Sequence, residues 1–165
     1  MKKAYGPDII PTTSSISETI YYVFSFASTK SREAHKLFAE GEKLAKKYKV
    51  TEKRLWHTKV NAFSSSSQWG ALRSLADSRL KPPISFKYFA LAAIKEHQST
   101  NEISRYIEKA SDADERYDLF YEAKMWKKAF QEARKMDDLR RVMQVRSACN
   151  MPEIQRACDE FLSAQ

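Results

Sequence analysis

Helix-start signals recur at short intervals along this chain, and they limit every helix to a few turns. Ser15 is followed three residues later by Glu18, and Ser99 by Glu102, which is the capping-box pattern. Further starts are expected at Thr51, Ser67, Ser85, Ser111 and, before Pro152, at Asn150. The prolines Pro82 and Pro83 end one segment because they lack a backbone N–H. The sequence therefore predicts many short helices.

The expected helices follow from these starts and from the apolar periodicity between them. Six cover about residues 16–28, 32–48, 52–64, 68–78, 86–97 and 100–110, and four more begin near 111, 125, 137 and 152. Short helices with brief links cannot bury a face alone, so they stack on their neighbours. We therefore expect an all-α fold, an α-solenoid of about nine to ten short antiparallel helices.

A weak internal repeat supports this architecture. Trp69 and Ala76 lie seven residues apart, and Trp126 and Ala133 have the same spacing. A small alanine where two helices approach, with a tryptophan beside it, resembles tetratricopeptide and clathrin-heavy-chain repeats. We expect an irregular tail over residues 1–14 and a single α-solenoid segment over 15–165, as a piece of a longer chain.

No pattern of catalytic or metal-binding residues stands out. The three histidines, His35, His57 and His97, share no helix face with each other or with a cysteine. Three scattered glycines cannot form a phosphate-binding loop, and no GxSxG motif occurs. Asp137 and Asp138 fit a helix cap better than an acid–base pair, and Cys149 and Cys158 fit packed, reduced thiols. We expect no enzyme activity, no cofactor and no metal.

The net charge of +8 is concentrated in the first half of the chain. Residues 1–83 carry 15 Lys and Arg against 7 Asp and Glu, whereas residues 84–165 carry 14 of each. No apolar run approaches the about 20 residues of a membrane span, and the opening lacks a secretory signal, which predicts a cytosolic chain. The basic stretch fits a solvated face, a protein-docking surface, or a surface for nucleic acid or anionic lipid. Because its aromatic residues Tyr48, Trp56 and Phe63 follow the apolar stripes, we expect most of them to pack in the core.

Four short motifs follow one another along the chain. Their residues are Val50, Lys53, Arg54, Trp56 and Lys59; Trp69 and Leu72; Lys81, Pro83, Ile84 and Phe89; and Lys95, His97, Glu102 and Tyr106. In this order the motifs resemble the C-terminal region of the number-sixteen subunit of the class C vacuolar-protein-sorting core. Thr51, His57 and Ser85 depart from the family pattern, and none stands at a catalytic position. The match covers about residues 45–135, and a paralogous subunit of a related trafficking complex shares the motifs.

The resemblance implies a scaffold of the HOPS and CORVET membrane-tethering complexes, peripheral on late endosomes, lysosomes or vacuoles. In that family the helical region recruits an SM-family (Sec/Munc-like) protein that promotes SNARE assembly and membrane fusion. The partners expected here are an SM-family protein and other class C tethering subunits, with no nucleic acid. The expected protein-binding residues are Lys43, Lys46, Lys47, Lys49, Lys53, Arg54 and His57.

Overall fold

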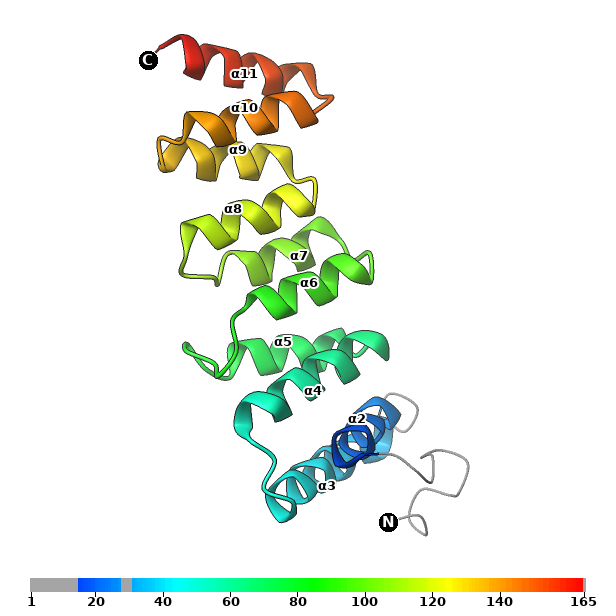
Figure 1. Cartoon of the computed structure of the whole chain (residues 1–165). Coiled ribbons are helices and arrows are strands. Elements are labelled where there is room, and N and C mark those ends of the chain that lie inside the picture. The colour runs from blue at the N-terminus through cyan, green and yellow to red at the C-terminus, as the bar shows by residue number, and fades with distance from the viewer. Residues whose placement is uncertain (1–14, 28–30, 165) are drawn as a thin grey trace. The chain divides into compact units, whose positions relative to one another are not determined.

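The computed structural model describes residues 15–27 and 31–164, so the expected tail over 1–14 lies outside the described residues. Within these ranges the chain forms ten α-helices, one short 3-10 helix and no β-strand (Figure 1). The elements are α2 (Ile16–Phe26), η1 (Ser31–Glu33), α3 (Ala34–Lys47), α4 (Glu52–Ser65), α5 (Trp69–Asp77), α6 (Lys87–Lys95), α7 (Thr100–Ile107), α8 (Ala113–Glu122), α9 (Trp126–Lys135), α10 (Leu139–Ala148) and α11 (Pro152–Ser163). The all-α prediction is confirmed.

The helices pack on neighbours that are close in sequence, as the α-solenoid prediction requires. The chain divides into two compact units, Met1–Ala92 and Ala93–Gln165. In the first unit α2 packs on α3 and α4, and α4 packs on α5. In the second unit α8, α9, α10 and α11 pack in succession, and α9 also contacts α11. Within residues 15–27 and 31–164 no helix exceeds 14 residues, so each depends on this packing for its stability.

Aromatic side chains form the core of the first unit. The rings of Phe24, Phe38 and Phe63 contact one another with centroid distances of 5.3 to 6.0 Å. Trp56 lies 6.3 Å from the ring of Phe89, and both side chains are buried. The prediction that Trp56 and Phe63 are packing anchors is therefore confirmed.

The internal repeat is visible in the helices. Trp69 is the first residue of α5 and Trp126 the first residue of α9, and both side chains are half-buried. Ala76 and Ala133, seven residues on, are almost completely buried. The two alanines thus lie in the close-packed interior of their units.

Several predicted helix caps are confirmed. Ser15 and Glu18 form the complete capping box, with the Ser15 amide donating to Glu18 Oε2 at 2.6 Å. The hydroxyls of Thr51 and Ser99 accept hydrogen bonds from amides of the helices that follow them, and Ser85 accepts one from the amide of Lys87. The Asp138 carboxylate likewise accepts from the Arg141 amide at 3.0 Å.

Three predicted caps are wrong. The cap of α5 is Gln68, because Ser67 takes a positive φ of 58° that ends the preceding helix. Asp112 caps α8 in place of Ser111, since its carboxylate accepts from the Asp114 amide at 3.1 Å. Met151 stands at the cap position of α11 in place of Asn150, although Pro152 does begin that helix.

In the part of the chain that the structure describes, five helices end on a residue with left-handed backbone geometry that is not glycine. These residues are Lys49, Ser67, His97, Lys124 and Asp137, with φ between 51° and 58°. After α8, for example, the Lys124 amide donates to the Tyr121 carbonyl at 3.0 Å, and the Met125 amide donates to the Phe120 carbonyl at 2.9 Å. The other four ends repeat these two bonds, which together make the Schellman motif.

The left-handed geometry of Lys124 generates a stability prediction. We expect Lys124→Gly to raise the free energy of unfolding by about 1 kcal/mol, because glycine has no Cβ to clash in this conformation. Lys124→Ala is the control, since alanine removes the same side chain but keeps the Cβ. Thermal unfolding of both variants makes the comparison, and equal melting temperatures would contradict the argument.

Gly41 is required by the approach of α3 to α2. A Cβ added there would lie 2.7 Å from Cζ of Phe24, whose ring is buried and packed on Phe38 and Phe63. The ring has little room to move. A Cβ added at Gly70, in the first turn of α5, would meet no atom within 4 Å.

The two glycines form a matched pair for mutation. We expect Gly41→Ala to lower the free energy of unfolding by about 1 to 3 kcal/mol through overpacking against Phe24. Gly70→Ala should raise it by about 0.5 to 1 kcal/mol, because alanine is the better helix former. Denaturant unfolding of the two variants tests this difference in sign. A stabilising Gly41→Ala would show that α2 and α3 do not approach as described.

Candidate functional site

The predicted protein-binding residues gather where α3 ends and α4 begins, and we call this surface the basic corner. It comprises Lys43, Lys46, Lys47, Lys49, Lys53, Arg54 and His57. The first six side chains are exposed, whereas His57 is half-buried. The end of α3 and the start of α4 are joined by a short link (Figure 1), and the six exposed cations lie on and beside this link.

Local hydrogen bonds explain how the chain turns at this corner. The Lys49 amide donates to the Lys46 carbonyl at 3.2 Å, and the Val50 amide donates to the Ala45 carbonyl at 2.9 Å. The Thr51 hydroxyl then caps α4 by accepting from the Arg54 amide. One helix ends and the next begins within four residues, so their basic ends are adjacent in the chain and held by backbone bonds.

Other cations of the first unit serve the fold. Lys59, one of the family-motif positions, forms an ion pair with Glu42 and lies 5.5 Å from the Phe24 ring. Arg79 pairs with Glu52 at 2.6 Å and lies over the Trp56 ring. By contrast, no residue of the basic corner forms an ion pair with an acidic side chain among the described residues. The positive charge of the corner is thus not neutralised from within.

Two exposed tyrosines lie beside these cations. The side chain of Tyr48 is 53% exposed, with the Lys47 ammonium 5.3 Å from its ring centroid. The expectation that Tyr48 packs in the apolar stripe is therefore wrong, because the helix ends before it and its backbone leaves the helical phase. Tyr88 is 43% exposed and meets the His57 ring edge-on at 4.4 Å. Sequence reasoning missed both as surface residues.

His57 differs from the other corner residues in its charge. Partial burial and, to a smaller extent, the nearby Lys53 ammonium lower the pKa of His57 below its ordinary value of 6.5. The imidazole is therefore mostly neutral at pH 7. It contributes an aromatic ring beside Tyr88 and little positive charge.

Comparison with known families agrees with the motifs. Residues 33–163 match the family model described as Vps16, C-terminal region. The chain belongs to this family. In the comparison with curated proteins, nothing matches. The family match confirms the resemblance and extends it on both sides of the predicted range of about 45–135.

Membership in the Vps16 family gives the broad function. Vps16 proteins are peripheral subunits of class C tethering complexes, which they form together with other subunits. These complexes act in vesicular and protein transport. The family of Vps16 C-terminal regions is a family of structural scaffolds and not of enzymes. A helix long and apolar enough to cross a membrane does not occur among the described residues.

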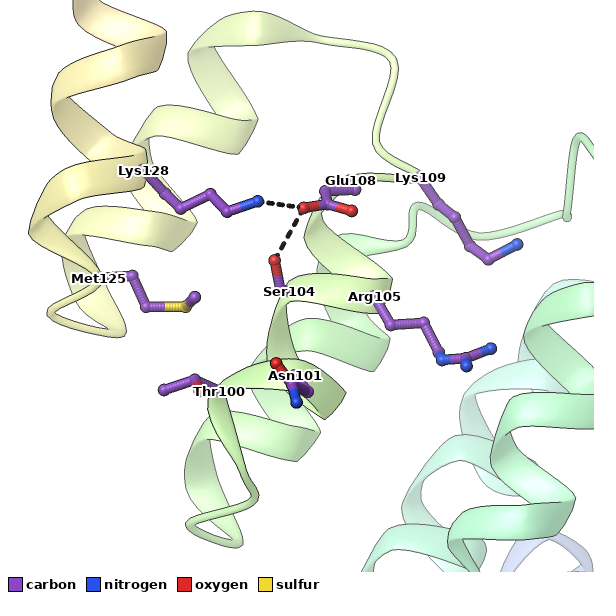
Figure 2. A pocket seen from close by; sticks show the side chains of 8 residues that line it. All are labelled: Thr100, Asn101, Ser104, Arg105, Glu108, Lys109, Met125 and Lys128. Carbon is purple, nitrogen blue, oxygen red and sulfur yellow. Dashed lines mark hydrogen bonds and ion pairs between the residues drawn. The ribbon is translucent and has the colours of Figure 1, made fainter.

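The second unit contains a polar pocket between α7 and α9. It has a volume of about 520 Å³ and is lined by Thr100, Asn101, Ser104, Arg105, Glu108, Lys109, Met125 and Lys128 (Figure 2). Glu108 accepts hydrogen bonds from Lys128 at 2.5 Å and from Ser104 at 2.9 Å, and these bonds lower its pKa. The Lys128 charge is therefore already balanced within the pocket.

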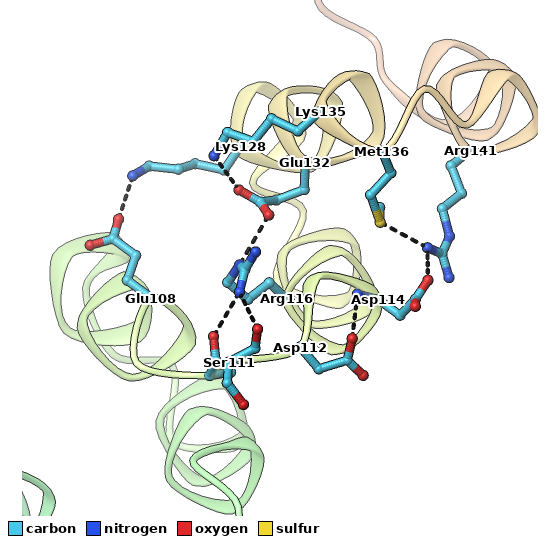
Figure 3. A network of polar contacts seen from close by, with 11 residues as sticks. Glu108, Ser111, Asp112, Asp114, Arg116, Lys128, Glu132, Lys135, Met136 and Arg141 are labelled. Carbon is cyan, nitrogen blue, oxygen red and sulfur yellow. Dashed lines mark hydrogen bonds and ion pairs between the residues drawn. The ribbon is translucent and has the colours of Figure 1, made fainter. Parts of the chain in front are cut away.

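A network of polar contacts fixes α9 against its neighbours (Figure 3). Arg116 of α8 donates to Glu132 of α9 at 3.0 Å and to the carbonyls of Ala110 and Ser111. Burial raises the pKa of Glu132, but hydrogen bonds from Lys135 and Arg116 outweigh burial and leave the pKa lowered. Glu132 thus stays ionised and holds α8 to α9.

The titratable groups show no arrangement of catalytic or metal-binding type in the described part of the chain. Among residues 15–27 and 31–164, no three His, Cys, Asp or Glu side chains gather as metal ligands would. Cys149 and Cys158 are both buried and reduced, as predicted, and burial raises the pKa of Cys158 to about 11. At that pKa the thiol remains protonated and unreactive at neutral pH.

The environment of His57 predicts its titration. We expect an NMR titration of the intact chain to give a His57 pKa below 6.5, and Lys53→Gln to raise that pKa by removing a neighbouring positive charge. Since the pKa is lower in the folded state, the contribution of His57 to stability is present above pH 6.5 and is lost as pH falls through the folded pKa. A His57 pKa at or above 6.5 would contradict the partial burial described here.

Proposed function

We propose that this chain is a scaffold segment of HOPS- or CORVET-type tethering complexes that recruits an SM-family protein through its basic corner. The recruited protein would support SNARE assembly and membrane fusion. The observation that carries the proposal is the group of six exposed cations without acidic partners, displayed at one turn of a chain of the Vps16 family. The function is recruitment, with no chemical step.

The composition of the basic corner suits a protein partner. Arg54 can form two parallel hydrogen bonds with one carboxylate, which lysine cannot do. Tyr48 and Tyr88 add exposed aromatic surface next to the cations, and tyrosine and arginine are, with tryptophan, enriched among the residues that dominate binding energy at protein interfaces. We therefore infer that the facing surface of the partner is acidic with apolar contacts for the tyrosines.

The corner also rests on a rigid base. Leu44 and Ala45 of α3 and Leu55 and Trp56 of α4 are buried directly beneath it. Because these anchors fix both helix ends, the corner loses little conformational entropy when a partner binds, and this favours affinity. The complex as a whole would place the chain in the cytoplasm, peripheral on late endosome, lysosome or vacuole membranes.

A second candidate function uses the same surface for nucleic acid or anionic lipid. It is favoured by one observation: Tyr48 is exposed beside Lys47 and is available to stack on a base. The affinity of such binding falls steeply as the salt concentration rises, because binding releases counterions.

A third alternative is that the chain is the paralogous subunit of a related trafficking complex. Parallel co-purification with the two types of SM protein would distinguish the two subunits.

Charge reversal at Arg54 tests the leading proposal. We expect Arg54→Glu to weaken capture of the SM protein at least about tenfold in co-purification and titration, because it places a carboxylate against an acidic surface. The far-UV circular dichroism and melting temperature should stay near those of the unchanged chain, since Arg54 is exposed.

Arg140→Glu on α10 is the matched control, an exposed arginine of the second unit with the same change of charge. It should leave SM-protein capture unchanged. Failure of the folded, unchanged chain to capture either type of SM protein would sink the proposal. Binding of duplex or single-stranded nucleic acid, or of anionic liposomes, that is lost with Arg54→Glu would favour the second candidate.

A further inference from the structure

A groove with an apolar floor lies between α9 and α11 in the second unit. It has a volume of about 260 Å³ and is lined by Lys127, Phe130, Gln131, Arg134, Glu153, Ile154 and Ala157. All of these residues belong to the two helices, which pack directly on each other. The groove is separate from the basic corner, which lies in the first unit.

The floor of the groove is formed by side chains of the core. Phe130 is 9% exposed and Ile154 is 6% exposed, so each presents a small apolar area to the groove. The Phe130 ring contacts the Phe161 ring of α11 edge-to-face, with 6.3 Å between the ring centroids. The floor is therefore preformed, and its small volume fits one or two anchoring side chains better than a small-molecule ligand, whose pockets hold about 300–1,000 Å³.

The α9 side of the groove is positively charged and polar. Lys127, Gln131 and Arg134 are spaced four and three residues apart, which places them on one face of the helix, and all three are exposed. Neither Lys127 nor Arg134 forms an ion pair with an acidic side chain among the described residues. The other two cations of α9, Lys128 and Lys135, pair with Glu108 and Glu132 (Figure 3). Of the four cations on α9, the two without an ion pair among the described residues are thus the two that line the groove.

Both walls of the groove are held in place by contacts outside it. The Arg116–Glu132 bond fixes α9 to α8. On the other side, Arg146 of α10 forms two hydrogen bonds with Asp159 of α11, at 2.5 and 3.2 Å. The Gln155 amide also donates to the Cys149 carbonyl at 2.7 Å, which ties the start of α11 to the end of α10. A ligand would therefore meet a site that is already formed.

We propose that this groove binds a short acidic segment of a partner protein that carries a bulky apolar side chain. The apolar side chain would lie on Phe130 and Ile154, and one or two carboxylates would pair with Lys127 and Arg134. Charge complementarity identifies the occupant: the cations are on the α9 side, while Glu153 on the α11 side would repel an acid and so fixes which way the segment faces.

Other occupants suit the groove less well. A nucleic-acid or lipid phosphate would use the two cations but leave the apolar floor without a contact, and it would lie near the Glu153 carboxylate. A basic segment would be repelled by Lys127 and Arg134. The acidic, apolar peptide is the occupant that uses both the charge and the floor.

A displayed library of random peptides of about twelve residues, selected against the whole chain, provides the probes. We expect the enriched peptides to share one bulky apolar residue next to Asp or Glu. Their affinity, measured by fluorescence anisotropy with synthetic copies, should fall at least about tenfold with Arg134→Glu and stay unchanged with Arg140→Glu. Circular dichroism and melting temperature control for folding, and both arginines are exposed.

A charge exchange makes the experiment sharper. Replacing the acids of the best peptide by lysine should abolish binding to the unchanged chain, and Lys127→Glu together with Arg134→Glu should bind the lysine peptide better than the acidic one. Enriched peptides without acids, or peptides that bind Arg134→Glu as well as the unchanged chain, would overturn the proposal. Dimerisation of the chain that is lost with Arg134→Glu would also overturn it, because a second copy would then occupy the groove.

Discussion

The reversal of the chain after each short helix is the feature on which the rest of this structure depends. At five helix ends in the described part of the chain a residue other than glycine adopts a left-handed conformation, and its own amide and the next amide bond back into the helix just completed. This geometry satisfies backbone groups at the helix end and turns the chain at once. The next helix then begins within a few residues and packs on the previous one. Helices of 8 to 14 residues gain their stability from that contact.

The same turns decide which side chains reach the surface. At the basic corner the turn at Lys49 directs Tyr48 and the flanking lysines outward, while Leu44 and Leu55 on either side are buried. A left-handed lysine is less favourable than glycine at such a position, yet it keeps a charge at the turn. The display of cations is therefore a consequence of how the chain reverses, and the buried anchors keep it in place.

The sequence predicts the fold class well because capping and periodicity are local. The helices start where Ser15, Thr51, Ser99 and Asp138 indicate, and the packed aromatic residues follow the periodic stripes. The errors at Ser67, Ser111 and Asn150 are each one residue in size, because the residue that follows, Gln68, Asp112 or Met151, takes the cap position. The exposure of Tyr48 depends on a turn with no glycine to mark it, and the α9–α11 groove depends on residues from two helices that are separated by another helix in the sequence. Tertiary packing decides both.

The net charge of the second unit does not show which of its cations form ion pairs. Residues 84–165 carry equal numbers of basic and acidic side chains, which suggests a neutral surface. The structure shows that many of these charges neutralise each other in pairs such as Lys128–Glu108 and Arg116–Glu132, and these pairs hold the helices together. Lys127 and Arg134 lie outside the pairs, beside an apolar floor. Ion pairing, which the sequence does not reveal, thus separates the cations that hold helices together in both units from those that form no ion pair among the described residues.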